Sequence, residues 1–202
     1  MVSPDFKPKV NFNAMDCLTY LEHALALAYS KYDDDFYDNL QKIRYNGGNV
    51  EYAARNHFLI ADWVKNNSFV FLDSLSADDI FEKNIDKKKF FKESSLVNPK
   101  IRIKFLKKES AINFTSDSLR AFGGDSDNRD TIFAAAVLSD IAGLDAAHTG
   151  FVIARKGQPL LFRHASQLKG KVIEQPLAEF LKTTKIKTPG IVFFGFSGQV
   201  RE

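Results

Sequence analysis

The first third of the chain carries apolar residues at helical intervals. Leu18, Leu21 and Leu25 recur every three or four positions, which places them on one face of a helix. The same spacing predicts helices over residues 15–30, 34–44 and 52–65, the last of them broken. Asn13 or Asp16 supplies the N-cap signal for the first of these helices.

After residue 67 the pattern changes to the alternation that is typical of strands. Ile101 and Ile103 alternate with Arg102 and Lys104, as they do in a half-buried strand. We predict strands over residues 69–72, 100–107, 149–154, 160–163 and 191–194, and a short helix over 177–183. Residues 155–158 carry a hairpin-turn signal. Helices followed by antiparallel strands favour an α+β fold over a parallel doubly wound sheet.

The composition fits a single globular domain over all 202 residues. Hydrophobic residues make up 45% and charged residues 26%, which argues against intrinsic disorder. The single cysteine excludes an intramolecular disulfide. No apolar run reaches the roughly 18 residues of a membrane-spanning helix, and the opening residues lack the basic and apolar regions of a signal peptide.

The net charge of +3 is too small to indicate a dedicated nucleic-acid-binding protein. It is unevenly spread, because residues 82–108 hold nine Lys and one Arg against three acidic residues, a net charge of +7. This basic, strand-rich segment fits a solvated surface. The alternative is attraction to an anionic polymer, such as nucleic acid or a cell-wall glycan.

The lone cysteine, Cys17, falls in the first turn of the first predicted helix. Unpaired backbone N–H groups and the helix dipole favour a negative charge there. We therefore expect the Cys17 thiol to ionise more readily than a free thiol, and the thiolate is the nucleophilic form. The alternative is a small buried core residue, because cysteine is among the most buried residue types.

His148 and His164 flank the predicted hairpin, each eight positions from Lys156. A turn centred on Lys156 makes them cross-strand neighbours on one sheet face, with Cβ atoms roughly 4.5–5.5 Å apart. A one-residue shift in turn type would put them on opposite faces. Two adjacent imidazoles suit thiol activation, one ring acting on the thiol and the other orienting the first. The three residues could also be zinc ligands, although no CxxC or HxxxH spacing supports that.

Three short motifs resemble the NlpC-type, papain-like cell-wall hydrolases. They are Met-Asp-Cys-Leu-Thr at 15–19, His-Thr-Gly-Phe at 148–151 and Arg-His-Ala at 163–165. A further block is similar to one branch of that superfamily, the N-acetylmuramoyl-L-alanine amidase-like proteins, long known as a domain of unknown function. This block comprises residues 43–45, 52, 55–58 and 62–63. The resemblance covers residues 16–194.

The resemblance implies a papain-like α+β fold, in which N-terminal helices pack on a central antiparallel sheet or half-barrel. It implies Cys17 as the nucleophile, His148 as general base and then acid, and His164 as the residue that orients His148. An oxyanion hole would include the Cys17 backbone N–H, because a helix start presents donors where negative charge develops. The resemblance also implies a peptidoglycan or muropeptide substrate, a periplasmic or secreted location, and no metal or other cofactor.

Five residues of the additional block are candidates for holding the muropeptide: Arg44, Tyr45, Arg55, Asn56 and His57. A guanidinium group suits the carboxylates of the substrate because it can pair with them through two hydrogen bonds. Alternatively, Arg44 or Arg55 neutralises a buried Glu22.

Our leading hypothesis is a cysteine amidase that cleaves the bond between N-acetylmuramic acid and L-alanine through a thioester. An endopeptidase with the same three residues, cutting between D-glutamate and the diamino acid, is the nearest alternative. Acyl transfer from the thioester to an amine is a further one. A non-catalytic glycan- or nucleic-acid-binding module that uses the basic segment belongs to another class, but we expect neither a nucleic-acid partner nor a membrane span.

Overall fold

The computed structural model describes residues 8–67, 69–72, 79–93, 96–122 and 130–197. Its first helices are α1 (Cys17–Tyr29) and α2 (Asp35–Arg44), followed by the short 3-10 helices η1 (Asn46–Gly48) and η2 (Tyr52–Ala54) and the π-helix η3 (Leu59–Val64). The prediction of two helices followed by a broken third is therefore confirmed. Asp16 caps α1, because its side chain accepts a hydrogen bond from the Thr19 backbone N–H.

Strands and short helices follow in the remainder of the chain. The strands are β1 (Val70–Leu72), β2 (Ile80–Asn84), β3 (Lys100–Lys104), β4 (Leu106–Lys107), β5 (Thr131–Leu138), β6 (Ala146–Ala154), β7 (Leu161–Ser166), β8 (Lys171–Pro176) and β9 (Gly190–Phe196). The helices are α3 (Lys87–Phe91), α4 (Lys108–Ile112), α5 (Ser116–Phe122) and α6 (Leu177–Thr183). In the described ranges, the main sheet has the strand order β1-β9-β5-β6-β7-β8, with β4 also paired to β9, and all of its pairs are antiparallel. The α+β prediction is confirmed.

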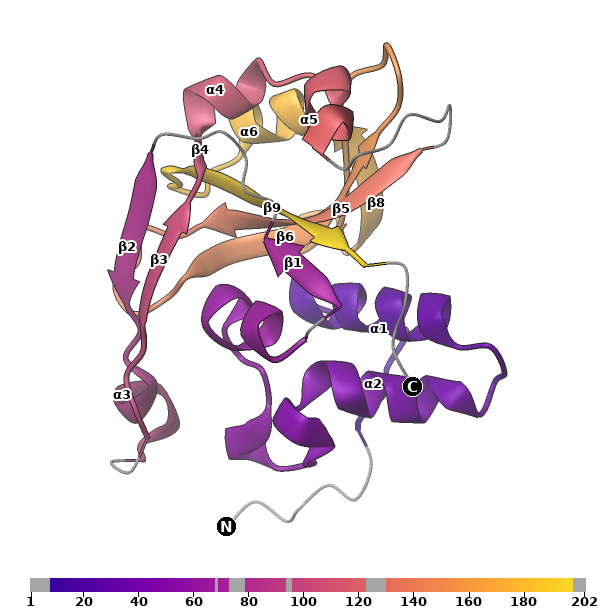
Figure 1. The fold of residues 1–202 in the computed structure, drawn as a ribbon, viewed down its shortest axis with the longest axis vertical. Coiled ribbons are helices and arrows are strands. Elements are labelled where there is room, and N and C mark those ends of the chain that lie inside the picture. Colours follow the sequence, from indigo (N-terminus) through magenta and orange to yellow (C-terminus); the bar gives the residue numbers. More distant parts are fainter. Residues whose placement is uncertain (1–7, 68, 73–78, 94–95, 123–129, 198–202) are drawn as a thin grey trace.

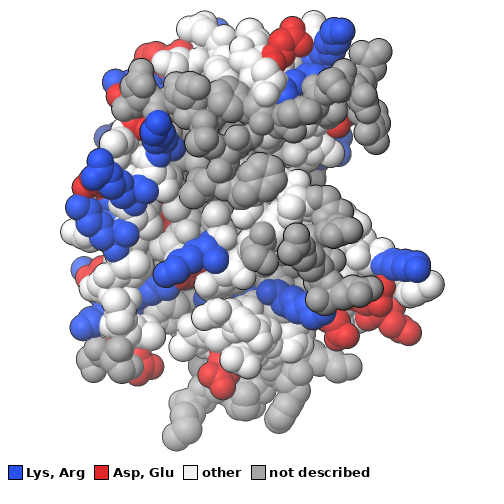
Figure 2. All heavy atoms as spheres, viewed as in Figure 1, with Lys and Arg blue, Asp and Glu red and all other residues white. Residues whose placement is uncertain are grey.

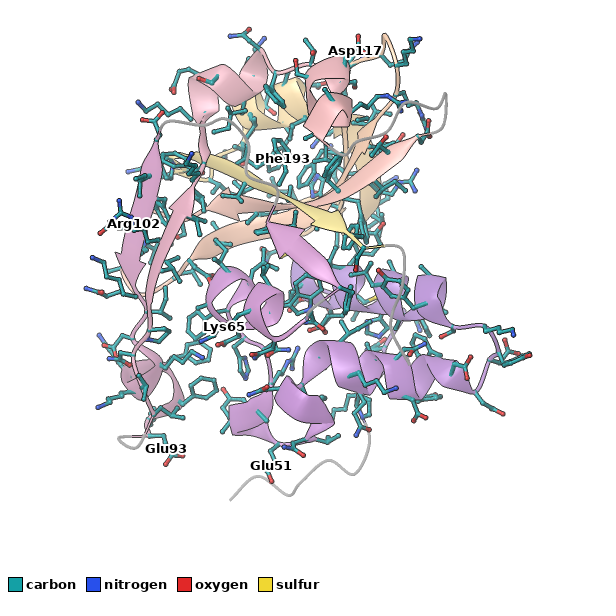
Figure 3. The ribbon with its side chains drawn as sticks, in the orientation of Figure 1. Glu51, Lys65, Glu93, Arg102, Asp117 and Phe193 are labelled. Atoms are coloured by element: carbon teal, nitrogen blue, oxygen red, sulfur yellow. The ribbon has the colours of Figure 1, made fainter. Side chains whose placement is uncertain are left out.

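Helices cover both faces of this sheet (Figure 1). On one face, α1, α2 and η3 share a core with alternate residues of β5, among them Ala134 and Ala136. On the other face, α4, α5 and α6 share a second core with Ala135 and Val137 of the same strand. Phe193 of β9 belongs to this second core (Figure 3). The small side chains of β5 let both helical layers approach the sheet closely.

The basic segment forms a separate two-stranded ribbon of β2 and β3 at one side of the molecule, with α3 at its far end (Figure 1). Lys and Arg side chains gather along this side (Figure 2), where Arg102 points outward (Figure 3). Several of these cations have acidic partners. Glu82 pairs with both Lys100 and Arg102, and Lys87 pairs with Asp62. The local excess of positive charge is therefore partly neutralised by neighbouring carboxylates.

Within the described part of the chain, no helix combines the length and the apolar character that a bilayer crossing requires.

Candidate active site

Cys17 is the first residue of α1, and its position is fixed by the cap that precedes it. The Asp16 Oδ1 accepts hydrogen bonds from the Thr19 backbone N–H at 2.7 Å and from the Thr19 hydroxyl at 2.8 Å. The helix consequently begins at the cysteine. The sulfur lies against β6, where it faces the backbone N–H of Thr149 as well as those of Leu18 and Cys17 itself.

The Cys17 thiol does not ionise as readily as its sequence position predicts. Burial raises its pKa above the ordinary value of 9.0, and the nearby Asp16 carboxylate raises it further. The N–H groups of Thr149 and Leu18 act in the opposite direction, but burial is the largest effect. The expectation of an acidic thiol is therefore wrong, because it considered the helix end and not the protein packed around it.

The two predicted histidines lie on one face of the sheet and are joined by a hydrogen bond. The Nε2 of His148 is 2.7 Å from the Nδ1 of His164, and the two rings are nearly perpendicular at 88°. Phe162 stacks on His164 with ring centroids 4.7 Å apart, and Phe180 of α6 stacks on His148 at 5.8 Å. The pair thus sits in an aromatic enclosure at the edge of the second core.

The strand register differs from the predicted one. Phe151 of β6 pairs with Arg163 of β7, so the hairpin is centred on Gly157 instead of Lys156. Gly157 adopts a φ of 65°, a left-handed conformation that glycine takes readily, which explains the position of the turn. His148 and His164 are therefore diagonal neighbours. The prediction of a shared face is confirmed, whereas the directly opposed pairing is wrong.

Gly150 provides the space that this diagonal contact needs. A Cβ atom at residue 150 would lie 2.8 Å from the Cβ of His164, 2.8 Å from a ring carbon of Phe162 and 2.6 Å from the Arg163 carbonyl oxygen. Real Cβ atoms essentially never lie so close to other atoms, so a side chain here would force its neighbours to shift. The absence of a side chain at residue 150 therefore lets β7, with the rings of Phe162 and His164, lie close against β6. The His164 ring is then within reach of His148.

A cavity of about 890 Å³ opens where β6 and β7 separate. The pairing of β6 with β7 ends at Phe151 and Arg163. A β-bulge at the start of β6 inserts Ala147 beside His148. The described residues that line the cavity come from β6 and β7, the β7–β8 turn, the start of β8, and the segment that leads into α1 with its first residue: Phe12, Asn13, Ala14, Met15, Asp16, Cys17, Ala147, His148, Ala165, Ser166, Gln167, Gly170, Lys171 and Val172. Cys17 and His148 thus line one cavity, although α1 packs on one face of the sheet and the His148 ring contacts the aromatic residues of the core on the other face.

Both imidazoles are electrically neutral at neutral pH. Burial and, to a smaller extent, the neighbouring His164 together lower the pKa of His148 from 6.5 to about 4. Burial also lowers the pKa of His164. A neutral imidazole has an unprotonated nitrogen and can accept a proton. Because the Nε2 of His148 is held by His164, the Nδ1 is the nitrogen left to act on a group in the cavity.

The five predicted substrate-binding residues lie elsewhere, and none is among the described residues that line this cavity. Arg44 is buried and donates from Nε to the Glu22 Oε2 at 2.6 Å and from a terminal nitrogen to the Lys9 carbonyl oxygen at 2.6 Å. The alternative prediction, that Arg44 neutralises a buried Glu22, is therefore confirmed. Burial nevertheless raises the pKa of Glu22.

The other four of these residues form contacts of the loop between α2 and η3. Tyr45 forms an isolated β-bridge with Arg55, and the Asn56 side chain donates to the Ile43 carbonyl oxygen at 3.1 Å. The His57 ring packs against Tyr52 and two phenylalanines of α3. These contacts are structural, and substrate binding by the five residues stays a prediction.

The model of the N-acetylmuramoyl-L-alanine amidase-like family matches residues 3–191 of the chain. The chain belongs to this family. A crystal structure of an N-acetylmuramoyl-L-alanine amidase from Bacteroides uniformis is similar at 26% identity and a TM-score of 0.73, covering 98% of this chain and 89% of that one. No curated protein matches this chain.

Two further solved structures share the fold. A putative xylanase from Bacteroides fragilis is 24% identical with a TM-score of 0.69, covering 95% of this chain and 92% of that one. A protein from Legionella pneumophila is 21% identical with a TM-score of 0.71, covering 90% of this chain and 75% of that one. At these identities the likeness concerns the fold alone.

Sequence reasoning missed the residues that surround the imidazole pair. Gln175 of β8 places its Nε2 3.2 Å from the His164 Nε2, and Phe162 and Phe180 enclose both rings. A strand over 171–176 was not predicted, so no pattern pointed to Gln175. The alternative zinc interpretation finds no support among the described residues, which bring no three His, Cys, Asp or Glu side chains into a metal-binding group.

Proposed function

We propose that this chain is a cysteine-dependent N-acetylmuramoyl-L-alanine amidase that acts on peptidoglycan fragments, and that it belongs to the NlpC-type, papain-like superfamily. One observation carries the proposal: in a chain of the amidase-like family, Cys17 lines the same cavity as His148, whose ring is hydrogen-bonded to His164. Family membership supplies the substrate class, and the cavity supplies a nucleophile and a base.

The reaction begins with a neutral thiol and a neutral imidazole. His148 Nδ1 takes the Cys17 proton as the sulfur attacks the carbonyl carbon of the lactyl group on N-acetylmuramic acid. The resulting tetrahedral oxyanion collapses, the carbon–nitrogen bond breaks, and His148 returns the proton to the amine of L-alanine. The lactyl group remains on sulfur as a thioester.

Water completes the cycle. His148 Nδ1 removes a proton from a water molecule, whose oxygen attacks the thioester carbonyl carbon. The carbon–sulfur bond breaks, the Cys17 thiolate takes the proton back from His148, and the muramic acid leaves with a free carboxyl group. Both halves of the reaction therefore use one base in the same position.

The pKa directions support general-base catalysis over a preformed ion pair. Burial raises the pKa of Cys17 and lowers that of His148, so both groups are uncharged before substrate binds. The thiol then loses its proton only as the sulfur attacks. Backbone N–H groups of Cys17 and Leu18 lie at the helix start, where they can donate to the developing oxyanion.

His164 orients the base. Its hydrogen bond to the His148 Nε2 fixes the plane of the ring and directs Nδ1 away from β7. Phe180 and Phe162 restrict rotation of the two rings by stacking on them. Their apolar surfaces also keep water from competing for the hydrogen bond between the imidazoles.

The test is product analysis of defined muropeptides by mass spectrometry, with wild type, Cys17→Ala and Cys17→Ser. Release of intact stem peptide and free sugar by the wild type, with loss of turnover in Cys17→Ala, supports the proposal. A cut inside the stem peptide would indicate the endopeptidase with the same residues. Full turnover by Cys17→Ala would refute the cysteine mechanism, and no turnover by wild type together with salt-sensitive glycan binding would indicate a binding module.

A further inference from the structure

Gln175 occupies a defined place beside the imidazole pair. In the register of β7 and β8, Phe162 lies opposite Gln175 and His164 lies opposite Ile173. Opposed residues of antiparallel strands project on the same side of the sheet. Gln175 therefore reaches His164 diagonally, and its Nε2 stands 3.2 Å from the His164 Nε2.

The three side chains form a continuous hydrogen-bonded row from Gln175 through His164 to His148. A neutral imidazole has one N–H donor and one acceptor nitrogen, so the two bonds of the row allow only two arrangements of protons. The group that Gln175 presents to His164 favours one of them, alongside the Ala165 carbonyl oxygen, which accepts a hydrogen bond from the His164 ring.

The two arrangements have opposite consequences for the base. If the amide NH2 donates to the His164 Nε2, His164 carries its proton on Nδ1 and donates to His148. His148 Nδ1 is then protonated and cannot accept a proton. If the amide oxygen accepts from a protonated His164 Nε2, His148 donates from its own Nε2 and its Nδ1 is free. The 3.2 Å contact is to the amide nitrogen, and a half-turn about the last bond of the Gln175 side chain brings the amide oxygen to the same position.

We propose that Gln175 is a positioning residue: its amide oxygen accepts from the His164 Nε2–H and thereby holds His148 with an unprotonated Nδ1. The inference rests on the proposed function, because it assigns His148 the role of base. The same arrangement is required after His148 has accepted a proton. Both nitrogens of His148 are then protonated, and His164 must still accept at Nδ1.

A neutral amide suits this place because it fixes the proton positions without adding charge. The described ring contacts of the two imidazoles are to each other, Phe162 and Phe180. Besides His148, the charged and titratable groups among the described residues that line the cavity are Asp16 and Cys17 from the α1 side and Lys171 from β8. A carboxylate in place of the amide would attract a proton to the pair and make His148 a stronger base.

The experiment compares wild type with Gln175→Met, Gln175→Glu and a control, Gln158→Met, in the exposed hairpin turn. Nitrogen-15 NMR of labelled histidine, without substrate, reads the proton position on each ring, and muropeptide turnover is measured across pH. We expect Nε2–H rings in wild type, the control and Gln175→Glu, and mixed tautomers in Gln175→Met. We further expect kcat of Gln175→Met to fall about tenfold at unchanged KM, the scale that one hydrogen bond commonly controls, and the acid limb of Gln175→Glu to move to higher pH.

Unchanged tautomers and an unchanged kcat in Gln175→Met would overturn the proposal, as would Nδ1–H rings in the wild type. The NMR result does not depend on turnover, so failure of the inference is distinct from failure of the proposed function. Full turnover by Cys17→Ala would refute the cysteine mechanism. The proton positions measured on the imidazole pair would still show whether Gln175 controls those positions.

Discussion

Replacing Gly150 by alanine tests whether close contact between β6 and β7 holds the imidazole pair together. The added Cβ would stand 2.6 Å from the Arg163 carbonyl oxygen, whereas ordinary contact begins at 3.4 Å, so the two atoms must separate by 0.8 Å. Two of the three close neighbours are a backbone oxygen and a Cβ atom, which cannot turn away as the end of a long side chain can. The strands themselves have to move.

We expect Gly150→Ala to lower the free energy of unfolding by about 1–3 kcal/mol, the usual cost of overfilling a packed site. We expect a larger effect on catalysis, about 100-fold in kcat, because a displacement near 1 Å misplaces the base. Urea denaturation measures the first quantity, and muropeptide turnover of the folded protein measures the second.

Gly157→Ala in the same hairpin is the matched control. Residue 157 has a φ of 65° and open space around it, so alanine there costs about 1–2 kcal/mol of backbone strain without touching the rings. We expect this variant to lose stability and keep kcat. Wild-type kcat in Gly150→Ala, or an equal loss of kcat in both variants, would refute the reasoning.

Three further predictions concern titration and buried charge. Because folding lowers the pKa of His148 from 6.5 to about 4, the unfolded chain binds the extra proton between these values. Stability should therefore fall as pH decreases from 6.5 towards 4, by up to about 3 kcal/mol, and chemical denaturation of wild type and His148→Gln checks this. Iodoacetamide should modify Cys17 more slowly at pH 7 than it modifies a free thiol, because burial raises the Cys17 pKa; a rate equal to or above that of glutathione would contradict this. Arg44→Met leaves the Glu22 carboxylate buried without its partner and should cost about 3–5 kcal/mol, whereas adding Glu22→Leu should restore most of it; denaturation curves that place the double variant below the single one would argue against this.

The sequence was informative where local signals decide the structure. The Asp16 cap and the apolar spacing after it located α1 and therefore the position of Cys17. Both histidine rings lie on one face as predicted, because the observed strand pairing differs from the expected one by two residues, which moves the turn centre by one residue and leaves the faces unchanged. Each of these features depends on a few neighbouring residues.

Other features depend on contacts between distant segments, which the sequence pattern does not reveal. Residues 131–138 form a central strand that is buried on both faces, so they show no alternation and β5 was not predicted. The direction of the Cys17 pKa shift follows from burial of the thiol by the protein around it. Gln175 was missed because its place beside His164 depends on the register of a strand, β8, that was not anticipated.

The division of the molecule into two cores separates the proposed catalytic groups by layer. Cys17 begins a helix of one core, whereas the histidines pack against aromatic residues of the other. Substitutions in the core beneath α6 can therefore change the surroundings of the imidazole pair and leave those of the Cys17 thiol unaltered. Substitutions in the core beneath α1 can do the reverse. The proposed base and the proposed nucleophile can in this way change separately among related chains.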